Sequence, residues 1–158
     1  MSTTEQDAAA VRLPPPFVFV AVLSLGYVLH RWVWAIPIPL EAGTLRLATL
    51  LTAVSGGGAL AAAMGLFQRS HQDPAPWKPT PEVLTSGVYR FTRNPMYVGM
   101  AVIQMAVAFH RGNGWMLLLV PMSLILVYLT AVRHEEAYLE AKFGDSYLRY
   151  KSAVRRWL

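Results

Sequence analysis

The chain has 158 residues, of which 54% are hydrophobic and only 15% charged, and its mean hydropathy is +0.36. This composition excludes an ordinary soluble domain of the same length, which would have to expose much of its apolar surface to water. The lack of cysteine excludes disulfides and a cysteine nucleophile. The formal net charge is +5, and the basic residues flank apolar segments, so we expect membrane lipids and no nucleic acid as partners.

Residues 1–16 are polar and alanine-rich, and they end in three prolines. We predict a disordered leader here. A cleaved signal peptide is not expected, because the basic region that opens such peptides is missing and the apolar run that follows is long.

Four apolar segments approach the roughly 20 residues that a helix needs to cross a bilayer core. They predict an all-α integral membrane protein, a single domain over 17–158, with four transmembrane helices at 17–36, 45–67, 95–110 and 115–132. The second segment is rich in glycine and alanine, so we expect it to be the most tightly packed helix. The sequence HRGNG joins the last two segments, which predicts a helical hairpin.

The positive-inside rule predicts the orientation of these spans, because lysine and arginine gather on the cytoplasmic side. With the N-terminus inside, the outer side carries Arg31, Arg46 and Arg111, out of 14 basic residues in all. The inner side carries Arg12, Arg69, Lys78, Arg90, Arg93, Arg133, Lys142, Arg149, Lys151, Arg155 and Arg156. We therefore expect both termini in the cytoplasm and the protein in a bacterial inner membrane.

The loop 68–94 is rich in proline and is predicted to be coil, and Asn94-Pro95 predicts the start of the next helix. Asparagine is a preferred N-cap, and proline is favoured at the first helical position. The free amide groups of this helix start lie beside Arg90 and Arg93, which suits a carboxylate or phosphate. The alternative is that the arginines only anchor the membrane edge and the asparagine is only a cap.

Arg133, His134, Glu135 and Glu136 follow the fourth span directly. Two glutamates at a helix C-terminus oppose the helix dipole, at about 0.3–1 kcal/mol each, and a cationic ligand would compensate. The alternative is a helix that continues into the cytoplasm, with these residues and Glu140 on a solvated face. Because the hairpin brings both stretches together, a zwitterionic ligand with an amino-acid head fits them.

The C-terminal tail is expected to form two helices that divide at Gly144 and Asp145. Glycine serves as a helix C′ residue and aspartate as the next N-cap. The apolar residues after this point recur at helical spacing among basic ones, which predicts a helix in the headgroup layer. They are Tyr147, Tyr150, Val154 and Trp157.

Two stretches, LTSGVYRFTRNPMYVG and EEAYLEAKFGDSYLRYKSAVRRWL, are spaced around the hairpin in a way that resembles a known family. It is the family of integral-membrane methyltransferases that includes isoprenylcysteine carboxyl methyltransferase and the phospholipid N-methyltransferases. The resemblance covers about the C-terminal half. It implies a cytoplasmic S-adenosylmethionine pocket within residues 80–158 and a lipid-like or hydrophobic small-molecule acceptor.

The cofactor contacts implied by the resemblance fall on Val83, Leu84, Tyr89, Asn94, Pro95, Met96, Tyr97 and Glu135. We predict that Glu135 holds the α-ammonium group and that the helix start with Arg93 holds the α-carboxylate. Tyr89 and Tyr97 are predicted to pack on adenine or to face the sulfonium.

Methyl transfer from a sulfonium is an in-line displacement, so the site must align donor and acceptor, exclude water and accept a proton from an amine or thiol. The predicted catalytic residues are Glu136, His134 and Arg133, with Tyr147 as a further available base. No residues have metal-ligand spacing, and no metal is expected.

Two positions depart from the family. Its eukaryotic prenylcysteine enzymes have histidine in place of Asn94, and their substrate-directed arginine aligns with Ala131, about half a turn from Arg133. Two alternative functions stay open. One is an NADPH-dependent reductase of the sterol-reductase type, whose pocket should need more cationic residues for the phosphates, and the other is a non-catalytic membrane subunit.

Overall fold

A computed structural model describes residues 8, 9, 11, 13–75 and 78–158, and within these ranges the fold is all-helical apart from one isolated bridge between Pro37 and Asn113. The predicted leader falls largely on residues 1–7, 10 and 12, which lie outside the described part. The elements in chain order are α1 (Pro15–Val28), the π turn η1 (Leu29–Val33), α2 (Ala42–Arg69), the 3-10 turn η2 (Gly87–Arg90), α3 (Pro95–Arg111), α4 (Gly114–Leu118), α5 (Val120–Val127), the π turn η3 (Tyr128–Val132), α6 (Arg133–Phe143) and α7 (Asp145–Ala153).

Three helical segments are long and apolar enough to cross a membrane, which supports a multi-pass membrane protein. They are Pro15–Val33, Ala42–Arg69 and Gly114–Phe143, with mean hydropathies of 1.5, 1.7 and 2.2. The remaining predicted span, 95–110, is helix α3, whose 17 residues reach only about 26 Å. The fold class is confirmed, and the number of four crossings stays a prediction.

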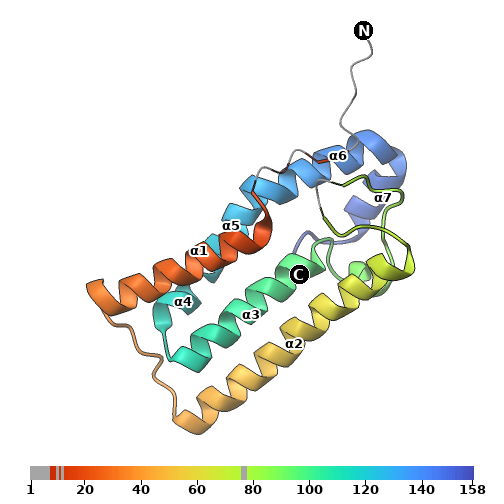
Figure 1. Cartoon of the computed structure of the whole chain (residues 1–158). Coiled ribbons are helices and arrows are strands. Elements are labelled where there is room, and N and C mark those ends of the chain that lie inside the picture. The colour runs from red at the N-terminus through yellow and green to blue at the C-terminus, as the bar shows by residue number, and fades with distance from the viewer. Residues whose placement is uncertain (1–7, 10, 12, 76–77) are drawn as a thin grey trace.

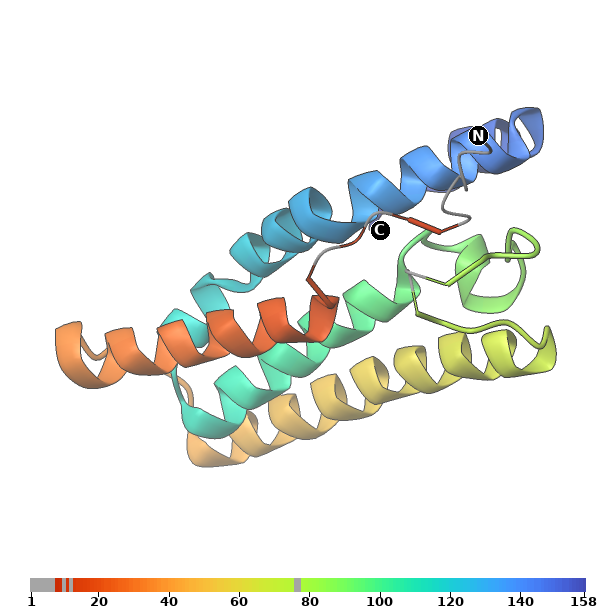
Figure 2. The same cartoon turned by 45° about the horizontal axis from the view of Figure 1, so that its top comes forward.

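Helix α3 is the central element of the bundle and packs on α1, α2, α4 and α5. In Figures 1 and 2 it lies between α2 on one side and, on the other, α1 with the long helical segment Gly114–Phe143, which comprises α4, α5, η3 and α6 and is called the C-terminal helix below. The apolar core joins side chains of α1, α3 and the C-terminal helix. Its buried members are Val18, Phe19, Tyr97, Ala101, Val127 and Val132.

Helices α2 and α3 approach closely where Gly56 faces Gly99. A Cβ atom on Gly56 would lie 2.8 Å from the carbonyl oxygen of Gly99, so neither helix tolerates a side chain here without moving apart. The expected tight packing of α2 is therefore confirmed on this face alone. Gly56 and Ala63 are its buried residues, and most of its remaining surface stays open.

Gly56→Ala is expected to lower the free energy of unfolding by about 1–3 kcal/mol, because backbone atoms of α3 must give way. Gly58→Ala is the matched control. Its Cβ would meet nothing within 4 Å, and it should raise the stability by about 0.5–1 kcal/mol through helix propensity. Thermal unfolding in detergent measures both, and equal stabilisation by the two variants would contradict the close approach.

The predicted hairpin between α3 and α4 is confirmed. Gly112 adopts the left-handed conformation (φ 59°) that ends α3, and the side chain of Asn113 caps α4 by accepting a hydrogen bond from Met116 N. Gly114 N donates to Ile36 O at 2.7 Å, so the loop after η1 closes this end of the bundle. The start of α3 and the end of the C-terminal helix consequently meet at the opposite end.

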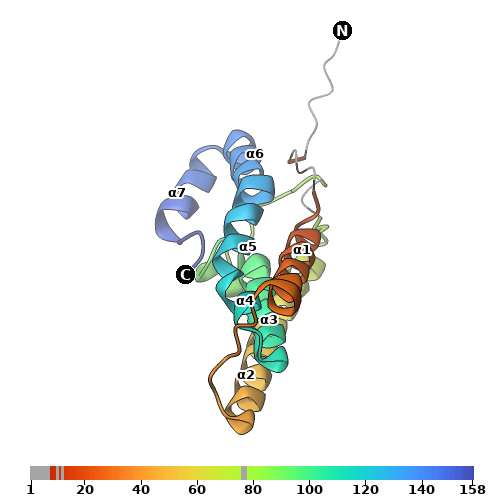
Figure 3. The same cartoon turned by 90° about the vertical axis from the view of Figure 1, so that its left-hand side faces the viewer.

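The tail folds back on the bundle beside α6 (Figure 3). Gly144, with φ 51°, occupies the N-cap position of α7, so Asp145 is the first helical residue and not the predicted cap. Helix α7 ends at Ala153, which leaves Val154 and Trp157 beyond it. Tyr147 is only 2% exposed and packs inside the fold, and the position of this helix in the headgroup layer stays a prediction.

The residues after α7 run along the entry to α3 and are tied to it by three hydrogen bonds. Arg93 N donates to Arg155 O at 2.9 Å, and both Thr92 Oγ1 and Asn94 Nδ2 donate to Arg156 O at 3.0 Å. The start of α3 is therefore held in place by the C-terminal tail.

Candidate functional site

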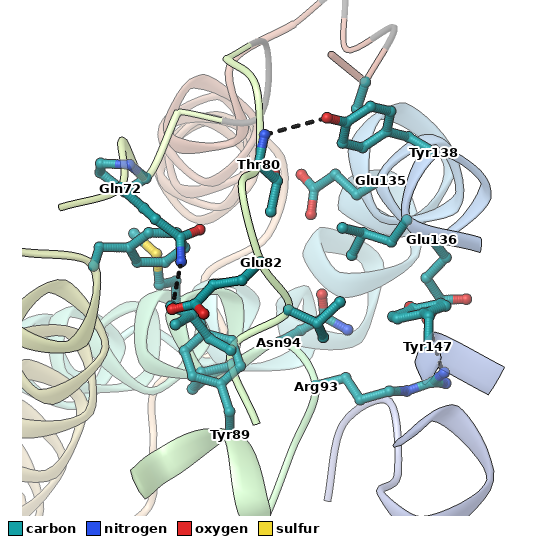
Figure 4. A pocket seen from close by; sticks show the side chains of 18 of the residues that line it. Gln72, Thr80, Glu82, Tyr89, Arg93, Asn94, Glu135, Glu136, Tyr138 and Tyr147 are labelled. Carbon is teal, nitrogen blue, oxygen red and sulfur yellow. Dashed lines mark hydrogen bonds and ion pairs between the residues drawn. The ribbon is translucent and has the colours of Figure 1, made fainter. Parts of the chain in front are cut away.

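A pocket lies at the end of the bundle where the start of α3, α6 and α7 meet the proline-rich loop (Figure 4). It holds about 870 Å³ of space, a figure that includes the open solvent at its mouth. Eleven of the candidate site residues singled out in the sequence line it: Val83, Leu84, Tyr89, Arg93, Asn94, Pro95, Met96, Tyr97, Glu135, Glu136 and Tyr147. The two ends of the hairpin thus form one pocket, and the cofactor contacts themselves stay predictions.

Helix α3 starts at Pro95 as predicted, but the side chain of Asn94 does not cap it. Its amide nitrogen donates to Arg156 O instead, while the backbone carbonyl of Asn94 accepts from Val98 N at 3.1 Å. The expected capping bond is wrong because the tail competes for the same side chain. Asn94 therefore links the tail to the pocket wall.

Arg93 is a buried guanidinium group with unused hydrogen-bond donors. Its side chain is 8% exposed, and one terminal nitrogen lies 3.3 Å from Glu136 Oε1. The atoms Nε and Nη1 are buried and find no partner in the part of the chain that the structure describes. Buried polar atoms are nearly always hydrogen-bonded, so free donors on a pocket wall indicate a place for an anionic group.

Glu136 is held by two arginines. Arg156 donates to its two carboxylate oxygens at 2.9 and 3.0 Å, and Arg93 also contacts Oε1, at 3.3 Å. The guanidinium of Arg156 also lies 4.8 Å from the centre of the Tyr128 ring. The alternative of a solvated face is wrong for Glu136, which is buried, whereas Glu140 does form a partly exposed pair with Lys151 at 2.7 Å.

Glu135 occupies a different environment from its neighbour. Its Oε1 accepts a hydrogen bond of 2.5 Å from the hydroxyl of Tyr97 on α3. Within the described ranges no cationic side chain pairs with it. A carboxylate withdrawn from water without a cation is unfavourable, so this position suits a positively charged group of a ligand.

Two of the predicted catalytic residues do not line the pocket. Arg133 is exposed, and its Nε donates to Nε2 of His134 at 3.3 Å. Of the remaining candidates, Glu136 is engaged by its two arginines. Burial raises the pKa of Tyr147 to about 12, so its hydroxyl keeps its proton at neutral pH.

The wall opposite Glu135 is built by residues that the sequence did not single out. Gln72 and Glu82 come from the proline-rich loop, and Phe67 from the end of α2. The ring of Phe67 meets that of Tyr89 edge to face, with 6.2 Å between centroids. Polar residues among prolines are ordinary in surface loops, so no sequence signal marked them.

The loop is held over the pocket by two bonds to the C-terminal helices. Thr80 N donates to the hydroxyl of Tyr138 on α6 at 3.2 Å. The hydroxyl of Tyr150 on α7 donates to Tyr89 O at 2.8 Å, which fixes η2.

The charge of the pocket wall is predominantly negative. Its described lining residues include a single basic side chain, that of Arg93. Four carboxylates share the wall, those of Asp73, Glu82, Glu135 and Glu136. In the same ranges no group of three or more His, Cys, Asp or Glu could hold a metal ion.

Comparison with known proteins gives a family and two relatives. A family model described as phospholipid methyltransferase matches residues 46–146. A protein-S-isoprenylcysteine O-methyltransferase of Schizosaccharomyces pombe is 35% identical over 72 residues, which is 46% of this chain and 30% of that enzyme. A Haemophilus influenzae protein described as uncharacterized is 41% identical over 63 residues, 40% of this chain and 100% of that protein. No solved structure matches the chain.

Proposed function

The chain belongs to the phospholipid methyltransferase family, and from this membership we propose that it transfers the methyl group of S-adenosylmethionine to a hydrophobic or amphiphilic acceptor. The matched relative from Schizosaccharomyces pombe is itself a methyltransferase, although this chain spans less than a third of it. The acceptor is proposed to enter from the bilayer and the cofactor from the cytoplasm. Both termini are proposed to lie in the cytoplasm of a bacterial cell.

The observation that carries this proposal is the charge of the pocket wall. S-adenosylmethionine combines a carboxylate, an ammonium and a sulfonium group, so its net charge is positive. Glu136 on this lining is paired with Arg93 and Arg156, and the three other carboxylates, those of Asp73, Glu82 and Glu135, complement such a ligand. A phosphorylated dinucleotide would need several cationic residues, which argues against the NADPH-dependent alternative.

The placement of the charges supports the proposed roles at the amino-acid end. The free Nε and Nη1 donors of Arg93 would bind the carboxylate of the ligand. Glu135, which has only a phenol hydroxyl as its partner, would bind the ammonium group. Tyr97 connects the proposed carboxylate site at the start of α3 with the proposed ammonium site. It lies in the first turn of α3, and its hydroxyl donates a hydrogen bond to Glu135.

The cofactor, when bound, supplies an electrophilic methyl group on sulfur, and the protein has to orient it and exclude water. Residues 72–75 and 82–84 of the loop and two tyrosines of α7, Tyr147 and Tyr150, line the pocket and narrow its contact with water. Among the residues predicted as catalytic, Glu136 is engaged by Arg93 and Arg156, and Arg133 and His134 do not line the pocket. We therefore propose that Glu136 acts by holding Arg93 in position, and that Arg133 and His134 act outside the cofactor pocket.

Thermal unfolding of the purified protein in detergent tests this function. S-adenosylmethionine or its demethylated product, at about 100 times its dissociation constant, should stabilise the fold by about 2.7 kcal/mol, or roughly 5–10 °C. NADPH should have no effect. A shift with NADPH alone would favour the reductase, and no shift with any of them would favour a non-catalytic subunit.

A further inference from the structure

A groove lies beside the C-terminal end of α2, where η2 packs against that helix. Its described lining shares no residue with that of the cofactor pocket. In Figure 1, α2 forms one edge of the bundle and meets α3 along its inner side, so its other side is left to the lipid of a bilayer. The groove is lined by small residues, by Phe91 and by two arginines, Arg69 and Arg90.

Small residues of α2 form the floor of the groove. Ala61 and Ala62 are exposed, and a Cβ atom on Gly65 would meet nothing within 4 Å. The start of η2 forms one side, because Gly87, with φ 56°, lies so close to α2 that a Cβ atom there would come within 2.9 Å of Leu66 Cδ1. The small side chains therefore leave open a space that bulky residues would fill.

The two arginines of the groove are exposed, and neither side chain has a hydrogen bond or an ion pair within the described ranges. No acidic residue belongs to the described lining either. Arg93 and Arg156, by contrast, are engaged by Glu136. The sequence placed Arg90 with Arg93 beside the start of α3, but Arg90 lines the groove and not the pocket. Two guanidinium groups that share one groove repel each other, so an anion bound between them is favourable.

The position of the groove along α2 favours a lipid over a soluble anion. Ala61 and Arg69 are eight residues apart, so the apolar floor extends about 12 Å along the helix from the arginine. Because α2 is long enough to cross a bilayer and ends at Arg69, the arginines reach the headgroups while the floor lies among acyl chains. Phe91, which follows Arg90, is 76% exposed and adds apolar surface there. A phospholipid fills both parts of the groove, whereas a free phosphate would reach only the arginines.

We propose that this groove binds one anionic phospholipid, with its phosphate between Arg69 and Arg90 and an acyl chain along the small residues of α2. Guanidinium groups bind phosphate through paired hydrogen bonds, and basic residues at the membrane surface attract anionic lipids. The inference does not depend on methyl transfer, because it uses no residue of the cofactor pocket. A lipid such as phosphatidylglycerol has no amino group, so it serves here as a bound partner and not as an amine acceptor.

Mass spectrometry of the intact full chain released from detergent tests the charge of the site. Titration with phosphatidylglycerol, and separately with phosphatidylcholine, gives the dissociation constant of the first bound lipid. The parent should prefer phosphatidylglycerol by about 10-fold, and Arg69→Gln and Arg90→Gln should each weaken its binding by about 5-fold. Arg149→Gln is the matched control, because Arg149 is exposed on α7 and does not line the groove. It should bind like the parent.

Gly65→Leu tests the floor of the groove without any change of charge. The new side chain occupies the space of the acyl chain, so binding of the first phosphatidylglycerol should weaken by about 5-fold or more. Gly58→Leu is the control, since Gly58 is equally open but does not line the groove. If Gly65→Leu lowers the unfolding temperature, the two arginine variants still decide the question.

The outcomes separate a lipid site from its alternatives. An equimolar amount of inorganic phosphate should not displace the lipid, and displacement would show a site for a free anion and overturn the proposal. A parent without a preference for phosphatidylglycerol, or an equal loss in Arg149→Gln, would show only diffuse attraction by the basic surface and overturn it as well. Binding of S-adenosylhomocysteine should be unchanged in Arg69→Gln, and a parent that does not bind it would overturn the proposed function alone.

Discussion

Glu135→Gln is expected to weaken binding of S-adenosylhomocysteine by about 10- to 100-fold while the protein stays folded. Glutamine has the same shape and can still accept the hydrogen bond from Tyr97, so the link between α3 and α6 is kept. The variant loses the negative charge that pairs with the ammonium group of the ligand. The dissociation constant, measured by calorimetry, checks the effect.

Glu140→Gln on the same helix is the control for this change. Glu140 pairs with Lys151 at the partly exposed surface and does not line the pocket, so its replacement should leave the dissociation constant unchanged. If Glu135→Gln binds the ligand as tightly as the parent, the ammonium site has been placed on the wrong residue.

Glu136→Gln is expected to destabilise the fold by roughly 3 kcal/mol, which corresponds to about 6–12 °C in unfolding temperature. The side chain of Arg156 is 35% exposed and can turn to water, but that of Arg93 is 8% exposed and would keep an uncompensated charge. Thermal unfolding without ligand measures the loss. The partly exposed pair of Glu140 provides the comparison, because Glu140→Gln should cost no more than about 1 kcal/mol.

The same variant decides between two roles for Glu136. A large loss of stability supports the ion-pair role. A variant that unfolds at the temperature of the parent but has lost methyl transfer would place Glu136 among the catalytic residues, as the sequence suggested.

The pocket could be predicted because local sequence patterns indicate both of its halves, the start of α3 and the glutamates that follow the last span. Proline is favoured at the first position of a helix and glycine just after the last one. Pro95 and Gly112 bound α3 in this way, so the hairpin and the meeting of its ends followed from short-range rules. The charges at Arg93 and Glu135 were then placed at the correct end. The pairing of Glu136 with Arg156 was not predictable, because it depends on how the tail returns.

Several contacts of the tail and the loop were missed because their partners are distant in sequence. Asn94 has the side chain of a helix cap, but it bonds to Arg156, 62 positions along the chain. Tyr147 belongs to an amphipathic pattern that fits either a membrane surface or a pocket wall, and only the fold separates these. Gln72 and Glu82 stand in a proline-rich loop whose path no periodicity describes.

The π turn η3 changes how the helix from Gly114 to Phe143 must be drawn on a helical wheel. A π turn holds one residue more than an α turn, so the phase of every later side chain is offset by about 100° from that of an uninterrupted α-helix. Ala131 and Arg133 lie within or at the end of this turn, and the glutamates come after it. When this helix is aligned with that of a relative, residues beyond 132 lie on the same side of the helix in both chains only if both have the extra residue in that turn.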